Sequence, residues 1–514
     1  MKSGYFVGPQ DLSMTLPVIP KEPGAEPILM VESLKKGHSL PFHKHKLILI
    51  LSAYRHFRDE LIQAGHDVEY VKADSYSYAL RDFNSRRGLK KIHVMAPRDW
   101  GLQESLRSLS KDVELEFHDD GGPHRLFFLS RAEFSSWASG RKQFRQDLFY
   151  KWMRKKCGIL LEPDGSPIGG KWSYDSENRK HAKGVPTPDH PHFPPSAITK
   201  AVINEVEGWA KGPGDGGRFN WPVTRTQALE ALDQFIEHRF SGYGDYQDAL
   251  IAGNAKLWHA LLSPVINIGL LSPGEVVSRA LEAYEEGRAP LNAVEGFIRQ
   301  IIGWREYIRG MYWEKMPGLR QANRFEATRD LPGFFWGEGV TSMGCLNDAI
   351  NSVLEDGYAH HIQRLMVIGN YCLIAGIAPE QVSHWFWAAF VDSSEWVELP
   401  NVVGMALGAD PSFTTKPYAA SGAYINRMSD HCKTCKYDVK KRHGSDACPY
   451  NFLFWSFMTE HRESIGKNPR LGMLYRSYDK WTDNEKHRIL ASAELHKKNC
   501  TQGATDYRFS PDDG

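Results

Sequence analysis

Three cysteines near the C-terminal end of the sequence have the types and spacing of a metal site. Cys432 and Cys435 stand three positions apart, and Cys448 follows after a further twelve residues, directly before Pro449. Two cysteines at this short spacing can bind one metal from a single turn, because both sulfurs point the same way, and a third thiolate supplies another corner of a tetrahedron. A Cys-Pro pair that closes a loop is a recurrent feature of iron–sulfur sites. The pattern therefore predicts a metal centre that still needs a fourth ligand.

The fourth ligand must come from another part of the chain. The candidates are two histidines of the same loop and four other cysteines: His431, His443, Cys157, Cys345, Cys372 and Cys500. A metal bound by three soft thiolates favours a fourth thiolate, and therefore a cysteine, over a histidine. We choose Cys345 because it lies at the head of a predicted helix, whose amide groups help to hold a thiolate charged. A structural zinc ion and an ordinary reduced cysteine pair remain alternatives, because spacing alone does not separate zinc from an iron–sulfur cluster.

The composition indicates a large core and few cysteines. The 514 residues suggest two to four domains, with 15 Trp, 21 Tyr and 25 Phe to fill them. A net charge of +1 means that a polyanionic partner would need a local basic patch. No apolar run approaches membrane-spanning length, and the start of the chain lacks the features of a signal peptide. Seven cysteines make no disulfide scaffold, so we expect a cytoplasmic monomer with no membrane partner.

The first 130 residues alternate short apolar segments with helical patterns. Apolar residues at 47–51 lead into an amphipathic helix that ends at Gly65, and the strands VEYVKA, KIHVMAP and VELEFHD follow, with a polar helix near 78–87. This alternation predicts a doubly wound parallel sheet with helices on both faces. Neither GxGxxG nor GxxxxGK[ST] occurs in this part, so a nucleotide-phosphate fingerprint is absent.

The rest of the chain divides by composition into a linker and a helical domain. Gly, Pro, Ser and charged residues crowd the segment from 163 to 222, which is typical of a long linker that wraps over folded parts. From 224 onward apolar residues recur at helical spacing, with Thr226 as the expected first cap. We therefore predict an α/β domain at 1–130, an interdomain linker at 131–223, and a larger all-α domain at 224–514.

Six segments in a fixed order resemble the photolyase/cryptochrome superfamily, most closely its iron–sulfur bacterial branch, the prokaryotic (6-4) photolyases. They are LLSPVINIGLLSP, EGFIRQIIGWREYIRGMYW, YAHHIQRLMVIGNY, EWVELPNVVGM, TKPYAASGAYINRMSD and the cysteine motif. The resemblance implies that the helical domain binds FAD, that light drives repair of (6-4) pyrimidine photoproducts, and that the partner is UV-damaged DNA, single- or double-stranded. It also implies a [4Fe-4S] cluster on Cys345, Cys432, Cys435 and Cys448.

The resemblance assigns seven residues to the flavin. Arg364 and Asp392 match the arginine–aspartate pair beside the isoalloxazine ring, although on their own they could form an ordinary interhelical salt bridge. Glu398 falls where other branches place Asn, Asp or Cys against flavin N5, and a carboxyl there could exchange a proton if burial raised its pKa. The positions around the phosphates and sugar chain, with Arg305 as the phosphate partner, are Ser263, Gln300, Trp304 and Arg305.

Two histidines and two tyrosines are the expected contacts of the DNA lesion. His360 and His361 are adjacent, so on a helix they point about 100° apart and cannot form an i, i+4 metal pair. By resemblance one of them acts as proton donor or hydrogen-bond partner, since (6-4) repair moves an oxygen or amino group between bases. Tyr418 and Tyr424 resemble the tyrosines that contact an extruded base.

Electron relay and antenna positions complete the resemblance. Trp385 and Trp336 resemble the aromatic residues that pass electrons to the photoexcited flavin, whereas Phe386 stands where the branch commonly has Tyr. Glu32 and the HKHK run at 43–46 resemble the antenna segment. The expected antenna chromophore is 6,7-dimethyl-8-ribityllumazine.

Two rival functions use parts of the same pattern. A cryptochrome-like blue-light photoreceptor would keep the flavin pocket without repair as its main task, and a zinc- or cluster-stapled nucleic-acid-binding protein would need no catalysis. The histidine pair and the lesion-type tyrosines favour repair. A basic loop around the cysteines fits contact with the DNA backbone, and its cations are Lys433, Lys436, Lys440, Lys441 and Arg442.

Overall fold

A five-stranded parallel sheet builds the N-terminal part of the protein, as predicted. The computed structural model describes residues 2–122, 124–182, 184–414 and 416–500. The sheet has the order β3-β2-β1-β4-β5, which reverses direction between β1 and β4. Its strands are β1 (Ser3–Val7), β2 (Ile28–Ser33), β3 (Val68–Ala73), β4 (Lys91–Met95) and β5 (Leu115–His118). The helices between them are α1 (Leu34–His38), α2 (Lys44–Gln63), α3 (Tyr76–Arg87) and α4 (Trp100–Leu109).

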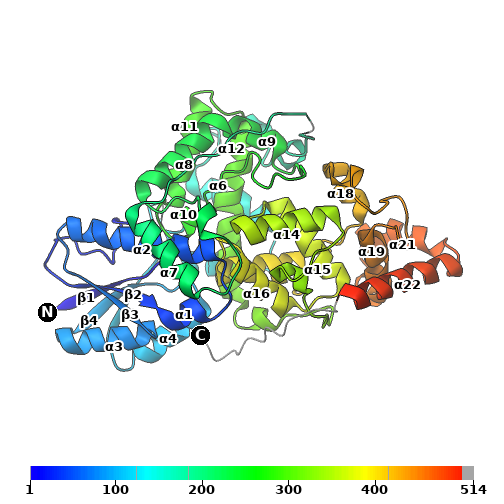
Figure 1. Cartoon of the computed structure of the whole chain (residues 1–514). Coiled ribbons are helices and arrows are strands. Elements are labelled where there is room, and N and C mark those ends of the chain that lie inside the picture. Colours follow the sequence, from blue (N-terminus) through cyan, green and yellow to red (C-terminus); the bar gives the residue numbers. More distant parts are fainter. Residues whose placement is uncertain (1, 123, 183, 415, 501–514) are drawn as a thin grey trace.

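Alternation of apolar side chains along the strands gives the sheet two buried faces. On β2, Ile28 and Met30 join the core that includes Ile48 of α2, whereas Leu29 joins the core that includes Leu80 of α3. Helix α2 lies on one side of the sheet, and α3 and α4 lie on the other (Figure 1). The apolar run at 47–51 forms part of α2. The doubly wound parallel sheet is therefore confirmed.

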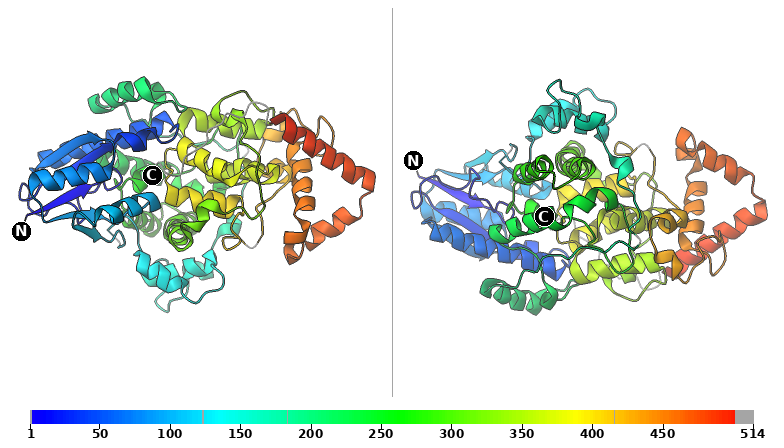
Figure 2. Two further views of the ribbon diagram at one scale, coloured as in Figure 1. Left: turned by 90° about the horizontal axis from the view of Figure 1, so that it is seen from below. Right: turned by 90° about the horizontal axis from the view of Figure 1, so that it is seen from above.

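The predicted linker contains three helices. They are α5 (Arg131–Ala138), α6 (Gln146–Cys157) and α7 (Ala197–Trp209). The chain passes from one side of the molecule to the other between α6 and α7 (Figure 2). Buried Arg154 of α6 donates to the carbonyl oxygens of Ile159 and Trp172, at 3.2 and 3.1 Å, and so fixes the extended segment that follows.

Helices dominate the chain from residue 225. The first, α8, is capped by Thr224, whose hydroxyl accepts from the amide of Gln227, so the expected cap at Thr226 was wrong by two residues. The helices up to the cysteine loop are α8 (Arg225–His238), α9 (Phe240–Tyr246), α10 (Ser263–Asn267), α11 (Pro273–Glu285), α12 (Leu291–Ile298), α13 (Glu306–Lys315), α14 (Gly344–Asp356), α15 (Asn370–Ala375), α16 (Pro379–Ala389), α17 (Glu395–Glu398) and α18 (Gly422–Met428). Those beyond it are α19 (Pro449–Glu460), α20 (Arg462–Ile465), α21 (Gly472–Asp479) and α22 (Asp483–Cys500), at the end farthest from the sheet (Figure 1).

Three π-helical segments interrupt this α-helical part. They are Arg299–Arg305, Gln363–Gly369 and Leu399–Ala406. A π-helical turn widens the helix and is frequent at functional sites. The first two contain residues predicted to hold the flavin, and the third begins directly after Glu398.

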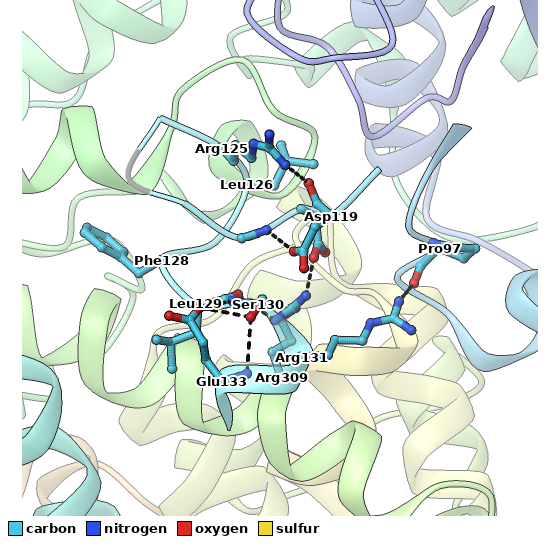
Figure 3. Close-up of polar contacts among 12 residues, drawn as sticks. Pro97, Asp119, Arg125, Leu126, Phe128, Leu129, Ser130, Arg131, Glu133 and Arg309 are labelled. Carbon is cyan, nitrogen blue, oxygen red and sulfur yellow. Dashed lines mark hydrogen bonds and ion pairs between the residues drawn. The ribbon is translucent and has the colours of Figure 1, made fainter. Parts of the chain in front are cut away.

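Buried ion pairs join the sheet to the helical part. Arg309 of α13 donates to a carboxylate oxygen of Asp120 and to the carbonyl of Leu129, and both residues lie in the segment that follows β5 (Figure 3). The neighbouring Glu306 accepts from the amides of Phe128 and Leu129, each at 3.1 Å. One hydrophobic core runs through both parts. Within the described ranges, the helices are too short or too polar for a bilayer crossing.

Candidate active site

A bidentate ion pair forms the centre of the candidate site. Arg364 lies in the second π-helical segment, and Asp392 lies in the loop between α16 and α17. Their nitrogen and oxygen atoms are 3.0 and 3.1 Å apart. The Ser263 hydroxyl donates to Asp392 Oδ2 at 2.7 Å, and the Asn267 side chain donates to the Asp392 carbonyl at 2.9 Å. Burial opposes the charge of Arg364, but the carboxylates of Asp392 and Glu398 outweigh it and raise its pKa. The predicted pair is thus formed, with Ser263 attached to it.

Glu398 is a buried carboxyl beside this ion pair. Burial, assisted by the negative charge of Asp392, raises its pKa to about 7, against the opposing charges of Arg364 and Lys46. Its Oε1 atom has no hydrogen-bond partner among the described residues. A carboxyl with a pKa of about 7 can hold or release a proton near neutral pH.

Lys46 was not singled out from the sequence, although it lies in the HKHK run. Its ammonium, buried in α2, donates to the Trp387 carbonyl at 2.6 Å and to the Ser393 hydroxyl at 2.7 Å. Burial lowers its pKa to about 7. A residue of the sheet part therefore reaches the loop that carries Asp392.

The two adjacent histidines face different surroundings. The His360 ring stacks on His259, with centroids 4.8 Å apart and planes at 11°, and neither His360 ring nitrogen has a partner among the described residues. His361 is accessible to solvent, yet burial lowers its pKa to about 4. His361 is therefore accessible although protein surrounds much of it. Of the two, His361 is the one that a bound molecule could touch.

Both predicted tyrosines are half-buried, and one of them shares a charged neighbour with His361. The charge of Asp175 acts on both His361 and Tyr418. Burial raises the pKa of Tyr424 to about 12, with Asp248 contributing. Burial, assisted by Asp175, also raises the pKa of Asp248 to about 6. Asp175 and Asp248 were not predicted, because no motif in the sequence distinguishes them from other acidic loop residues.

The first π-helical segment carries three of the predicted flavin residues and one that was missed. Gln300 and Trp304 are half-buried. The Arg305 guanidinium donates to the Leu126 carbonyl at 2.8 Å and lies 4.1 Å from the centroid of the Phe127 ring. Its Nε and Nη2 atoms have no partner among the described residues, nor does Nη2 of the neighbouring Arg299. Burial lowers the pKa of Arg305 to about 9. These unpaired buried donors fit an anionic group that would complete the site.

Aromatic rings surround Trp385, one of the two residues of the predicted relay. Buried Trp385 donates its ring N–H to the Phe335 carbonyl at 2.8 Å and packs edge-on against Phe386, with centroids 5.1 Å apart. Phe386 stacks on Phe390 at 5.0 Å, and the Arg364 guanidinium lies 4.2 Å from the Phe390 centroid. Trp336 is half-buried at the end of the turn that contains Phe335. A chain of rings therefore leads from Trp385 to the central ion pair.

The four predicted cysteines come together around a small cavity. Cys345 is the second residue of α14, and it shares this cavity with Cys432, Cys435 and Cys448. Burial, with the three other thiols adding, raises the pKa of Cys345 well above its ordinary value, while the Leu346 amide opposes this rise. All four cysteines are free of disulfide bonds.

The spacing of these sulfurs bears on the choice of metal. A single zinc ion with Zn–S bonds of about 2.3 Å would hold its sulfurs roughly 3.8 Å apart. No three of the four sulfurs lie within 4.8 Å of one another in the described structure. In this arrangement the sulfurs do not have the spacing that a single zinc ion imposes. His431, a rival fourth ligand, instead contacts Asp348 Oδ2 at 2.9 Å.

Charged partners hold the basic cysteine loop. Arg442 donates to Glu485 of α22 at 2.5 Å, and its guanidinium lies 4.3 Å from the Trp481 ring centroid. Lys441 pairs with Asp446 inside the loop. The loop is thus tied to the C-terminal helices, and part of its positive charge is neutralised.

A second cavity of about 470 Å³ opens at the carboxyl ends of β1 to β4. Ligands of doubly wound sheets bind at this edge, where the strand order reverses. The residues that follow each strand line it at 8–11, 33–38, 74–76 and 96–99, together with Lys46 and Trp387. Glu32 also lines the cavity, where Arg55 holds its carboxylate at 2.7 Å. The sequence singled out Glu32 and the HKHK run as antenna positions, but it did not predict the cavity that Glu32 and Lys46 line.

The chain is similar to proteins of known class. A family model described as deoxyribodipyrimidine photo-lyase-related protein matches residues 5–221. The (6-4) photolyase of Agrobacterium fabrum is 42% identical over 91% of this chain and 93% of that protein. A bacterial class III photolyase from Agrobacterium tumefaciens covers 97% of this chain and 98% of its own, with a TM-score of 0.54 and 16% identity. A Synechocystis cryptochrome covers 83% and 88%, with a TM-score of 0.52 and 13% identity. At these identities the two solved structures show the shared fold alone.

Proposed function

The chain belongs to the photolyase/cryptochrome family, and from this we propose that it is a DNA photolyase that uses light to repair (6-4) pyrimidine photoproducts. The observation that carries the proposal is the buried Arg364–Asp392 pair, flanked by Glu398 and opened to solvent on the side of His361. The 42% identity to a protein named (6-4) photolyase supports the choice of lesion.

FAD is the cofactor that the family implies, and the residues around this pair fit it. Arg364, Asp392, Ser263 and Glu398 would meet its ring system, and the unpaired donors of Arg299 and Arg305 offer positive charge to its phosphates. Gln300 and Trp304, on the same π-helical segment as Arg305, would contact the sugar chain. When bound and reduced, FAD supplies the electron that light transfers to the lesion.

The residues of the chain provide charge balance and protons. Arg364 and Asp392 neutralise each other, so the pair can remain buried without the cost of an isolated charge. Glu398, buried beside this pair with a pKa of about 7, can hold a proton there. His361, with a pKa of about 4, is a neutral imidazole at physiological pH and donates one N–H hydrogen bond to the group that must move between the bases.

Aromatic residues position the lesion and relay electrons. Tyr418 and Tyr424, half-buried near the charges that surround His361, would pack against the extruded bases. Trp385 and Trp336 would return electrons to the site. Phe386, between Trp385 and Phe390, is a poor hole carrier, so the relay must pass it by tunnelling or by another route.

The four cysteines would hold a [4Fe-4S] cluster. Their thiol-only donor set is typical of zinc or iron–sulfur, and the resemblance of the cysteine motif to the iron–sulfur branch favours the cluster. The cavity at the carboxyl ends of β1 to β4 would hold the antenna, for which we propose 6,7-dimethyl-8-ribityllumazine. The basic loop would contact the DNA backbone, and binding should weaken with salt.

Repair of defined lesions tests the proposal. The flavin-loaded, reduced protein is illuminated with blue light in the presence of oligonucleotides that carry either one (6-4) photoproduct or one cyclobutane dimer. We expect restoration of the (6-4) substrate, no restoration in the dark, and loss of repair with retained flavin in His361→Asn. A protein that binds and photoreduces FAD but leaves both lesions intact would be a photoreceptor, and the proposal would be wrong.

A further inference from the structure

Three side chains with metal-binding atoms meet on the sheet, far from the cysteines in the sequence. They are His93 of β4 and Glu116 and His118 of β5. The parallel register places His93 directly beside Glu116, and His118 follows Glu116 by two residues on the same face. The sheet itself therefore gathers the three side chains, and no flexible loop is needed to bring them together.

Their ligand atoms have the spacing that a small cation requires. His93 Nδ1 lies 2.9 Å from His118 Nε2 and 3.8 Å from Glu116 Oε2, and the three ligand atoms lie within 4.8 Å of one another. Bonds of about 2.0–2.2 Å to one tetrahedral ion would place these atoms roughly 3.3 Å apart. The observed distances bracket this value, so small side-chain rotations would complete the geometry.

We propose that His93, Glu116 and His118 form a binding site for a divalent transition-metal ion such as Zn²⁺. Two imidazoles and one carboxylate are a ligand set that zinc accepts, and three protein ligands leave a fourth position for water. The two imidazoles face each other through ring nitrogens that share one proton at most when both rings are neutral. Without a metal, one of these nitrogens donates to the other; a metal ion would instead accept the lone pairs of both facing nitrogens, with the proton of each ring on its other nitrogen.

The surroundings prepare the histidines as ligands. Tyr5 of β1 stacks on His93, with centroids 4.5 Å apart and planes at 17°, and restricts the orientation of the ring. One cation competes with the metal: Lys91 Nζ lies 2.7 Å from Glu116 Oε2. This ion pair is partly exposed and contributes little, so a metal can displace it.

The two aspartates that follow His118 have other partners. The backbone carbonyl of Asp119 accepts from Arg125 and its carboxylate accepts from the Gly121 amide at 2.7 Å, while Asp120 pairs with Arg309 (Figure 3). The site is therefore limited to three protein ligands. Among the described strands, β5 is a four-residue edge strand that pairs with β4. A metal between the two would secure the strand that leads into the segment held by Arg309 of α13.

Zinc titration of the intact protein tests the site. Isothermal titration calorimetry with ZnCl₂ on the flavin- and cluster-loaded protein should give one site that is lost or weakened at least about tenfold in both His93→Ala and His118→Ala. Lys91→Gln should bind more tightly than the parent, because it removes the competing cation. His238→Ala provides the control: this exposed histidine has a nearby acid, Glu237, at 3.8 Å but no third ligand, and its loss should change nothing.

Two results would overturn the proposal. One is a parent protein with no zinc uptake at micromolar metal. The other is a parent site that persists unchanged in both histidine variants, which would place the ion elsewhere, for example on the cysteines. Retention of the flavin spectrum shows that each variant is folded. Glu116→Gln keeps the shape of the side chain and removes its charge. Weaker zinc binding by this variant would assign the carboxylate as the third ligand.

Discussion

Replacement of Glu398 by glutamine offers the sharpest test of the electrostatics of the flavin site. The amide has nearly the same shape as the carboxyl but stays neutral at every pH. Burial raises the pKa of Glu398 from 4.5 to about 7. Each pKa unit corresponds to about 1.4 kcal/mol. The free energy of ionising Glu398 is therefore higher by about 3 kcal/mol in the folded protein than in the unfolded chain.

The sign follows from proton binding. Below pH 4.5 the carboxyl is protonated in both states and does not affect the free energy of unfolding. Between pH 4.5 and about 7 the unfolded chain releases this proton while the folded protein keeps it, so stability falls as pH rises. Above about pH 7 both states are ionised, and the loss levels off at about 3 kcal/mol. Glu398→Gln should therefore match the parent near pH 4.5 and become progressively more stable than it toward pH 8.

The assay is chemical unfolding of the flavin-loaded protein in the dark, followed by tryptophan fluorescence at several pH values. The matched control is Glu237→Gln. Glu237 is an exposed acid on α8 with 71% of its side chain accessible, so the stability of this variant should follow that of the parent at every pH. If the free energy of unfolding of Glu398→Gln also runs parallel to that of the parent from pH 5 to 8, Glu398 is ionised throughout this range in the folded protein. The proton that we assign to Glu398 would then not exist.

Three further experiments, with five variants, test other parts of the site. Asp392→Asn leaves the Arg364 guanidinium buried without its carboxylate, so we expect a loss of about 3–5 kcal/mol in stability and release of FAD on gel filtration; full FAD retention would contradict this. His361→Asn should slow (6-4) repair by at least about 100-fold with FAD retained, whereas His360→Asn should mainly lower the unfolding temperature, because that ring stacks on His259. Cys345→Ser should lose iron and the brown colour, while Cys372→Ser, a buried thiol outside the cluster cavity, should keep both; equal iron in the two proteins would remove Cys345 from the ligand set.

Periodicity predicted the class of the N-terminal fold but not every element. The strands from 68, 91 and 115 were recognised because short apolar segments alternate with helical ones. Strand β2 was not singled out, since a continuous apolar run such as ILMV is buried on both faces and lacks a clear period. Helix α7 escaped for another reason: the Pro- and Gly-rich sequence on both sides dominates the composition, and only Thr199, Val202 and Val206 of the helix are buried. The choice of Thr226 over Thr224 failed because propensity does not distinguish two threonines within one turn.

The residues of the candidate site that lie in or beside recognisable sequence motifs could be predicted, and the others could not. Arg364 and the cysteine loop lie in segments that resemble the family, and Asp392 lies three residues before another such segment, EWVELPNVVGM. The structure brings each set together. Residues without a motif, such as His259 and Asp248, become visible only when the chain folds, because their neighbours are distant in sequence. Arg305 shows the remaining limit: its sequence position predicts a phosphate partner, but in the fold one guanidinium nitrogen is already used by the Leu126 carbonyl. Its role toward the flavin stays a prediction.

The two chromophore sites that we propose share one buried wall. Lys46 lines the N-terminal cavity, and its ammonium reaches Ser393, the residue next to Asp392. Lys46 and Glu398 both have pKa values of about 7, and each charge favours the other. Two such groups titrate together, so a change in the occupant of the cavity that displaces Lys46 would also change the protonation of Glu398. The electrostatics of the flavin site therefore depend on a residue of the sheet part, and neither half of the chain carries the complete site.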